Sequence, residues 1–437
     1  MNGIRLLSLI MLVVFSMAVA AAQLVTGRLA TSFYAWEQFD TVGTSHQSVR
    51  AFQAVQLSVA QGDVALHTSL LGTTNVVGEF GDAGRVRLFN LYVSWLNIGK
   101  SVDLHLGRQL VFAGVGNGSI DGLVAQAYFL NRGIRVTGFG GATVSPEFAG
   151  VRKNMHENYH FGGQIVTTLI PDARIGISYA NRREERDPYM ALRTRDTSFT
   201  PVSYLVMHDA DAEELGSADA SYTLHDRLSV YGRYDYDFKN VRTSRAQGGV
   251  RVNVTSDLAV TGDYIHRLPR ISFNSIFSAF VTNAVDEIEG GVDYGFTPML
   301  RAFGRLAHVS YAEDERSTRW TLGVNSAYGS ASYSGSDGYA GELQSISLQG
   351  TYPFWGKTVV PMAGVSYASY RLSRESERQS AFGVLAGAIV RPAPSFSVDV
   401  QGQWLNNTLM RRDLRVQVKL MYWFAERLSL FNGEGTR

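Results

Sequence analysis

Apolar and polar residues alternate one by one along much of the chain, which is the period of a β-strand. In the segment 228–238, Val230, Tyr234 and Tyr236 share one face, while Arg233 and Asp235 share the other. The segments 287–296, 345–354, 396–404 and 414–424 repeat this alternation. Windows with helical periodicity are few. The pattern predicts an all-β protein with many strands.

Residues typical of tight turns separate the strand segments at ten places. These are Gln61-Gly62-Asp63, Ile98-Gly99-Lys100, Asn131-Arg132-Gly133, Pro171-Asp172, His225-Asp226, Ser256-Asp257, Thr297-Pro298, Tyr328-Gly329-Ser330, Trp355-Gly356-Lys357 and Pro392-Ala393-Pro394. The connections between them are mostly longer and more polar, and the longest runs from about Arg182 to Gly216. One end of the structure is therefore predicted to be short-turned and the other to carry loops.

Apolar-out and polar-in alternation with this asymmetry is typical of an outer-membrane barrel. A sheet that spans a bilayer must close so that no backbone group is left unpaired in hydrocarbon. We predict a transmembrane antiparallel up-and-down β-barrel over residues 23–424, with about 18 to 22 strands, short periplasmic turns and longer extracellular loops. The alternative is a soluble β-sandwich, solenoid or multi-domain β protein. Charged strand faces and the lack of a Pro/Gly-rich linker argue against it.

The first 22 residues have the layout of a cleaved secretory signal. Arg5 precedes an apolar run from Leu6 to Val19, and three alanines precede Gln23. A retained anchoring helix is the alternative, but its apolar run is short for a membrane span. After residue 23 no run of about 18 apolar residues occurs. We therefore expect export to the cell outer membrane of a Gram-negative bacterium, with residues 425–437 as a C-terminal tail.

The amino-acid composition excludes several kinds of site and partner. The 437 residues include no Cys, which excludes disulfides and thiolate metal sites. The formal net charge of +1 provides no general field to attract nucleic acid, so no nucleic-acid partner is expected. Of the 40 basic residues only five are Lys and the rest are Arg. No cofactor is indicated.

Two segments resemble known outer-membrane proteins. Leu414 to Phe424 resembles the carboxy-terminal signal strand of Gram-negative barrels, although a further segment ending near Phe431 is an alternative closing strand. The stretch 102–122, with Leu106-Gly107-Arg108-Gln109 and then Gly114-Val115-Gly116-Asn117-Gly118-Ser119-Ile120-Asp121-Gly122, resembles a hairpin of porin-like and alginate-export-like barrels. The resemblance implies a porin for passive diffusion of small solutes, in contact with outer-membrane lipid and lipopolysaccharide.

Two further motifs are candidates for metal or nucleotide chemistry. His156-Glu157-Asn158-Tyr159-His160 reads HExxH, but it enters a period-2 strand, where the two His lie about 13 Å apart and cannot chelate one zinc as on a helix. The Gly114–Gly122 run lacks the spacing of a dinucleotide fingerprint and is predicted to be a tight loop leaning into the lumen. No catalytic constellation emerges, so we predict that the chain is not an enzyme.

The inward-facing charges are the candidate functional residues. The pore-lining candidates are Arg108, Arg135, Arg233, Asp235, Asp237, Arg251, Asp263, Glu287, Glu289, Asp293, Arg301 and Arg305. Arg108 requires a bulge at Gly107 to turn inward, and otherwise pairs with headgroups at the membrane interface. Mixed signs predict at most a modest anion preference. The alternative is that the charges pair with one another and only stiffen the wall.

Two loops are candidate constrictions: the polar 182–216 loop, and the apolar 268–284 loop. The apolar composition of the second loop suggests burial in the lumen.

Two functions remain open. The first is a self-sufficient porin, which 16 to 18 strands favour. The second is a structural sheath around a periplasmic or lumen-occupying protein such as a multihaem cytochrome, which 20 or more strands favour because a wide unplugged barrel leaks.

Overall fold

In the computed structural model, the described residues are 23–40, 45–78, 84–144, 156–185, 189–194, 201–206, 211–269, 283–373 and 375–428. Within them, 22 strands form one antiparallel sheet, and two short strands form a separate hairpin. The strand number lies at the upper limit of the predicted range. The expected signal peptide, residues 1–22, and the segment near Phe431 lie outside the described residues.

The first half of the sheet contains β1 (Gln23–Asp40), β2 (Ser45–Gln61), β3 (Val64–Val77), β4 (Arg85–Ile98), β5 (Val102–Ala113), β6 (Gly116–Phe129), β7 (Ile134–Thr143), β8 (Tyr159–Thr167), β9 (Ala173–Glu184), β12 (Asp211–Leu224) and β13 (Leu228–Asp237). The second half contains β14 (Arg242–Asn253), β15 (Leu258–Arg267), β16 (Val285–Thr297), β17 (Leu300–Ser310), β18 (Arg316–Ser326), β19 (Gly329–Gly338), β20 (Glu342–Thr351), β21 (Val359–Arg371), β22 (Gln379–Ala393), β23 (Phe396–Asn407) and β24 (Met410–Leu428). The separate hairpin is β10 (Tyr189–Thr194) and β11 (Pro201–Val206).

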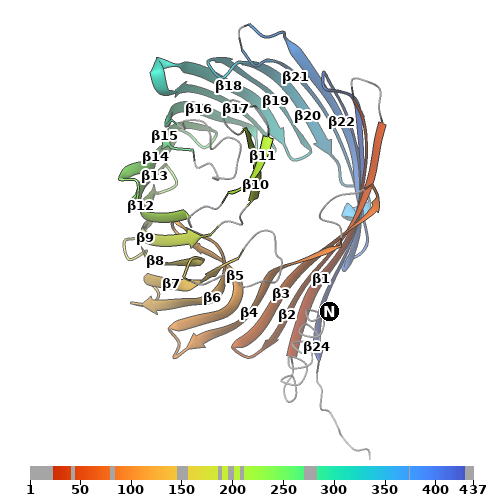
Figure 1. Ribbon diagram of the computed structural model, residues 1–437. Coiled ribbons are helices and arrows are strands. Elements are labelled where there is room, and N and C mark those ends of the chain that lie inside the picture. Colours follow the sequence, from red (N-terminus) through yellow and green to blue (C-terminus); the bar gives the residue numbers. More distant parts are fainter. Residues whose placement is uncertain are drawn as a thin grey trace, which may run out of the picture.

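The sheet closes into a barrel because β1 pairs with both β2 and β24 (Figure 1). At the seam Gln23 lies opposite Leu428 and Gly27 lies opposite Phe424. A Cβ on Gly27 would come within 2.3 Å of the Phe424 ring, so the ring packs directly over the glycine backbone. The strand 414–424 is therefore part of the closing strand, and its pairing continues past Phe424 to Leu428.

The alternation of the sequence determines which face points outward. On β13, Val230 and Tyr234 are 41% and 46% exposed, whereas Asp235 is 3% exposed. Large apolar side chains are similarly exposed on the other strands. Because closure pairs the backbone of the first and last strands, an apolar exterior is compatible with a hydrocarbon environment. The fold is the predicted closed antiparallel up-and-down β-barrel, an architecture typical of outer-membrane proteins.

The ten predicted turns join consecutive strands at one end of the barrel. Gly62 and Gly99 adopt φ of +58° in two of them, a left-handed conformation that glycine reaches without strain. A short 3₁₀ turn, η4 (Trp355–Lys357), occupies the turn between β20 and β21.

The other end has the longer connections, as predicted, for example between β7 and β8 and between β15 and β16, but not all of them are long. Gly114 and Val115 alone join β5 to β6, and Thr408 and Leu409 alone join β23 to β24. Another 3₁₀ turn, η3 (Ala312–Asp314), lies between β17 and β18. These short connections are exceptions to the predicted asymmetry, since the connections at this end are on the whole longer than those at the other end.

The helical segments in the described part of the chain are too short to cross a membrane.

Candidate functional site

Apart from Arg108, the candidate charges lie on the inner face of the barrel wall. On β16, Ile288 is 62% exposed and faces outward, so the neighbouring Glu287 and Glu289 face the lumen. The same alternation places Arg135 on β7, Arg233, Asp235 and Asp237 on β13, Arg251 on β14, Asp263 on β15, Asp293 on β16, and Arg301 and Arg305 on β17 with their side chains inward.

Asp293 is the centre of a charge network across three strands. Its carboxylate accepts hydrogen bonds of 2.6 Å from Arg251 Nη1 on β14 and of 2.6 Å from Arg305 Nη2 on β17. Arg305 Nε also lies 4.0 Å from Glu289 Oε1. One carboxylate thus compensates guanidinium groups on both sides of its own strand.

Paired charges recur around the lumen. Further ion pairs include Arg174 with Asp219, Arg182 with Glu184, Arg233 with Asp235, Arg319 with Glu287, Arg371 and Arg378 with Glu342, and Arg415 with Asp413. Most members are partly exposed, and the buried carboxylates of Asp235 and Asp413 each bind an Arg, as a charge removed from water requires. The signs alternate around the wall instead of forming a ring of one charge, as the pairing alternative anticipated.

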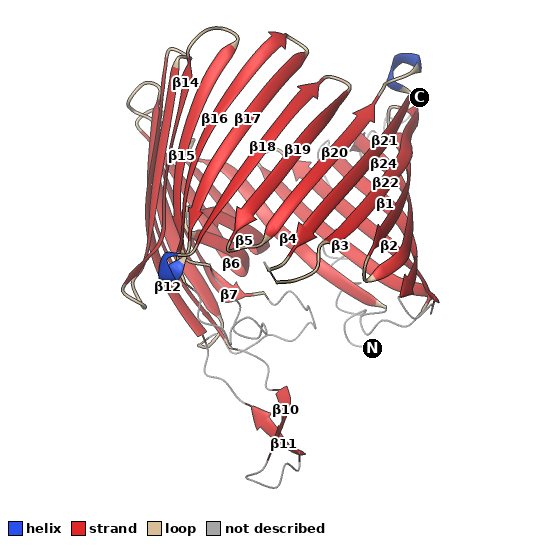
Figure 2. Ribbon diagram, turned by 90° about the horizontal axis from the view of Figure 1, so that it is seen from above, coloured by secondary structure: helices blue, strands red, loops and turns tan. Residues whose placement is uncertain are grey.

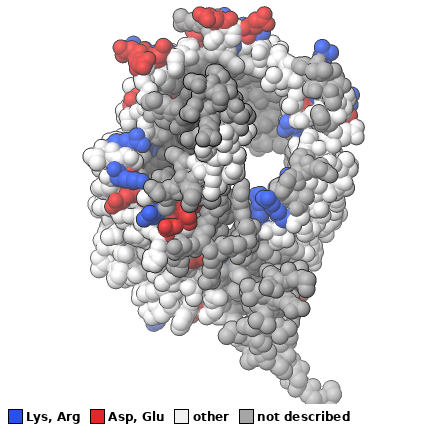
Figure 3. All heavy atoms as spheres, viewed as in Figure 1, with Lys and Arg blue, Asp and Glu red and all other residues white. Residues whose placement is uncertain are grey.

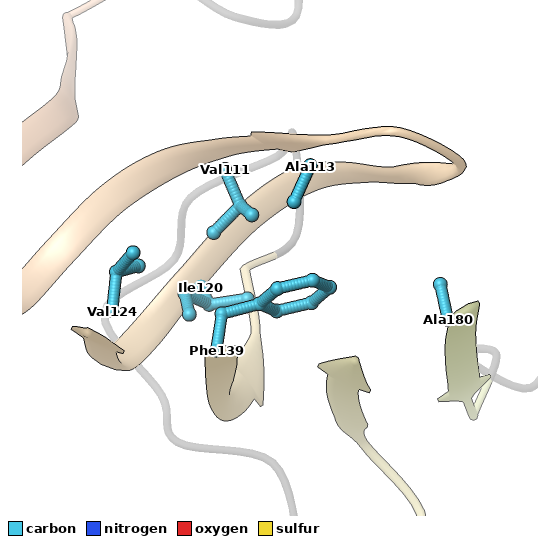
Figure 4. Close-up of a cluster of buried hydrophobic side chains, with 6 residues drawn as sticks. All are labelled: Val111, Ala113, Ile120, Val124, Phe139 and Ala180. Atoms are coloured by element: carbon cyan, nitrogen blue, oxygen red, sulfur yellow. The ribbon is translucent and has the colours of Figure 1, made fainter. Parts of the chain in front are cut away.

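The end of the hairpin β5–β6, from Gln109 to Ser119, lies beyond the pairing of the hairpin with β4 and β7 and packs on the inner face of β7–β9. Val111, Ala113 and Ile120 are at most 3% exposed and cluster with Phe139 on β7 and Ala180 on β9 (Figure 4). This is the lumen side of β9, since Ile177 on its opposite face is 63% exposed.

The other face of the hairpin is free of this cluster. Leu110 and Phe112 on β5 are 48% and 72% exposed. Since their neighbours pack against the wall, these two side chains point away from it. The barrel therefore carries part of its own chain inside the lumen.

Two glycines allow the hairpin tip to approach the wall. Gly114 has φ of +65°, and a Cβ there would lie 1.9 Å from Ser178 Oγ. A Cβ on Gly116 would lie 2.4 Å from the Phe139 ring. The Val115 backbone N–H donates to Ser178 Oγ over 3.0 Å. The Gly114–Gly122 run was predicted to be a loop, but it is a two-residue turn followed by β6, because its glycines serve close packing.

The hairpin bends away from the wall near Gly107. Gly107 has φ of +126°, and a Cβ there would lie 2.3 Å from the Leu91 carbonyl oxygen. The register with β4 passes through this point without a shift, so the bulge required by the sequence interpretation is not formed. Arg108 instead binds Asp121 of β6 through two hydrogen bonds of 2.7 Å each, and its side chain is 12% exposed.

Of the two candidate constriction loops, one differs from expectation in its described part. Within the described part of the 182–216 loop, β10 and β11 pair with each other and project beyond the barrel end, so this part does not fold inward (Figure 2). Of the 268–284 loop, residues 270–282 lie outside the described residues.

The two His of the HExxH motif lie in different elements and not on one helix. His160 lies in β8, is 2% exposed and meets the Phe139 ring edge-on at 4.9 Å between centroids. His156 lies exposed in the preceding turn. Among the described residues, no group of three or more His, Asp or Glu side chains is arranged to hold a metal ion.

A cavity of about 500 Å³ lies between the hairpin tip and the inner wall of β13–β15. Its basic lining residues are Arg233, Arg245 and Arg267. The last two were not among the candidates. Arg245 lies an even number of residues from Arg251 on β14, so the alternation could have identified it as inward-facing. The sequence did not show which part of the wall faces the hairpin. The face seen in Figure 3 is hollowed at its centre, with basic side chains beside the opening.

No protein-family model matches the chain, and no curated protein matches it in sequence. Solved structures with a similar arrangement include OccAB3 of Acinetobacter baumannii, with 10% identity, TM-score 0.42, and coverage of 92% of this chain and 99% of that one. OccK2 (OpdF) of Pseudomonas aeruginosa has 12% identity, TM-score 0.42, and coverage of 92% and 98%. OpdQ of Pseudomonas aeruginosa has 10% identity, TM-score 0.43, and coverage of 92% and 98%.

Proposed function

We propose that the protein is an outer-membrane channel through which small hydrophilic solutes diffuse passively. The observation that carries this proposal is a closed barrel of 22 strands with an apolar exterior and a charged interior. Such an interior holds water, and a continuous hydrated lumen is a pathway for solutes. The protein would act in the outer membrane of a Gram-negative bacterium, after export through a cleaved signal peptide.

The inward charges named above are the proposed pore lining. Because carboxylates such as Asp293 compensate the neighbouring guanidinium groups, most of the wall discriminates little between cations and anions. The hairpin β5–β6 is the proposed constriction, since its tip occupies part of the lumen.

The sheath hypothesis rested on a wide barrel without a plug. Although 22 strands is the number that favoured it, the hairpin fills space that an occupant would need. The wall of the lumen is also largely polar and charge-paired, whereas a permanent protein partner is usually held by an apolar surface. We therefore favour the self-sufficient channel.

Single-channel recording in a planar bilayer tests the proposal. Purified barrel, shown to be folded by its heat-dependent gel mobility, should give steady stepwise openings. In the variant Asn117→Cys, a charged thiol reagent should reduce the current, because Asn117 lines the cavity at the hairpin tip and the chain has no native Cys.

The matched control is Asp63→Cys, which lies exposed in the turn between β2 and β3, away from the hairpin. The reagent should modify this residue with little effect on current. A folded barrel that never conducts would refute the channel. Equal block of both variants would refute the hairpin as the constriction.

A further inference from the structure

His160 lies beneath the docked end of the hairpin β5–β6. Its ring is 2% exposed and faces the lumen side of β8, since Phe161 on the opposite face is 45% exposed. A Cβ added to Gly118 of β6 would lie 3.3 Å from His160 Nδ1, so the backbone of the hairpin covers the ring directly. On the wall side the ring meets Phe139 of β7. The hairpin therefore separates a titratable group from the lumen.

The hairpin offers this histidine only uncharged groups. Its docked face is formed by Val111 and Ala113 of β5 and by Gly116, Gly118 and Ile120 of β6. The carboxylate of β6, Asp121, follows Ile120 and so lies on the opposite face, where it binds Arg108. A proton on the ring would find no counter-charge on the hairpin.

The wall places a cation, and not a free carboxylate, beside the ring. Arg182 of β9 lies directly opposite this histidine in the register, and Gly141 of β7 lies opposite it on the other side. Glu184, on the same face of β9, binds Arg182. In the turn before β8, His156 is exposed and Glu157 is half-buried. Protonation would thus add a second positive charge next to a guanidinium group whose carboxylate is already engaged.

The docked hairpin requires the neutral form of the imidazole. Burying a charge that has no bound counter-charge is far more costly than burying a neutral polar group. Undocking would expose the ring to the lumen, where an imidazole in water takes up a proton below about pH 6.5. Because only the undocked state binds this proton readily, acid shifts the equilibrium toward undocking.

We propose that protonation of His160 releases the hairpin tip from the wall, so that the constriction is narrow near neutral pH and wider in acid. This proposal rests on the proposed channel function and adds the regulation of its constriction. The buried histidine would make the width of the lumen respond to the proton concentration on the side from which the hairpin is reached.

The accessibility of a buried thiol measures release of the hairpin without requiring conductance. The variant Val111→Cys places a thiol on the docked face, where Val111 is 3% exposed, and the chain has no native Cys. The probe is dithiodipyridine, which reacts with thiols in acid as well as at neutral pH, applied to the folded barrel in detergent micelles. At each pH its rate is divided by the rate for Asp63→Cys in the exposed turn between β2 and β3. This ratio removes the pH dependence of the thiol chemistry itself.

The ratio should rise by about tenfold or more between about pH 7 and about pH 5, the linkage expected for one proton taken up only by the released state. With His160→Gln added, it should change by less than about twofold, because the amide does not titrate. His160→Phe should give the same result, and it keeps an aromatic ring against Phe139 if the smaller amide disturbs docking. The matched control is His67→Gln, which removes a histidine of β3 that stacks on Tyr92 of β4. This control should keep the full rise.

A ratio that stays flat in acid, or that rises equally with and without His160, would overturn the proposal. Conductance measured on the same barrels separates this proposal from the channel itself. Openings of wild type should shift to a higher level in acid, and those of His160→Gln should not. A barrel that conducts while its ratio stays flat overturns the pH response and leaves the channel standing. A ratio that rises through His160 in a barrel that never conducts supports the release of the hairpin and overturns the channel.

Discussion

Replacing Gly114 by Ala should release the hairpin tip from the wall and change the current. Two costs are involved. Any non-glycine residue at φ of +65° is strained by about 1–2 kcal/mol. In addition, the new methyl group would lie 1.9 Å from Ser178 Oγ, so either the tip or the wall must move.

The control Gly62→Ala separates these costs. Gly62 has a similar φ of +58°, but no atom lies within 4 Å of its Cβ position. The difference between the variants is therefore the steric cost, about 1–3 kcal/mol, plus the hydrogen bond from Val115 to Ser178, about 1 kcal/mol. Their sum of about 2–4 kcal/mol raises the population of undocked tip by about 30- to 700-fold.

Single-channel recording measures the effect. Gly114→Ala should show frequent excursions to a higher conductance level, whereas Gly62→Ala should resemble wild type. The double variant Gly114→Ala/Ser178→Gly should show fewer excursions than Gly114→Ala, because it removes both the Oγ and the Cβ that meet the new methyl group. It should not reach the wild-type level, because it also removes the acceptor of the Val115 N–H. Identical traces for the two single variants would refute the conclusion that the docked tip limits the current.

Two other predictions concern the wall. Asp293→Asn should leave Arg251 and Arg305 without their shared carboxylate, so the reversal potential in a salt gradient should shift toward anions, while the exposed turn variant Asp63→Asn should not shift it. Leu306→Arg changes an outer-face residue that is 59% exposed, and it should lower the free energy of unfolding in lipid vesicles by about 2–4 kcal/mol in a denaturant titration. Leu372→Arg, outside the strands and 73% exposed, should have little effect; equal losses in both variants would contradict an outer face in contact with lipid.

The strands and turns could be predicted from the sequence because their determinants are local. Val230 is exposed and Asp235 is buried because they lie on opposite faces of the same strand, as the alternation predicts. Gly62 provides the left-handed conformation that its turn requires. The lengths of the connections at the end opposite the ten short turns were harder to predict. Polar residues such as Thr408 occur both in long loops and in two-residue turns, so polarity alone did not identify the short connections among the long ones.

The site depended on contacts between distant segments. The sequence indicated that the Gly114–Gly122 run leans into the lumen, but not that Gly114 meets Ser178, 64 positions later in the chain. Arg245 and Arg267 also became a candidate site only when the tip was placed opposite them. Alternation places a side chain on a face, whereas the partner across the lumen is set by the curvature of the whole sheet.

The seam between β1 and β24 has a consequence for biogenesis. The first and last strands share a register that runs from Gln23 opposite Leu428 to Phe39 opposite Arg412. Until the last strand has been translocated, β1 has one unpaired edge, and such an edge can pair with other chains. The pairing of β1 with β24, which closes the ring, therefore has the greatest sequence separation of the strand pairings. It can form only after β24 has been translocated. A chain truncated before residue 410 would keep its hairpins but would lack β24, the strand that pairs with β1. Its sheet would stay open, with an unpaired edge at β1.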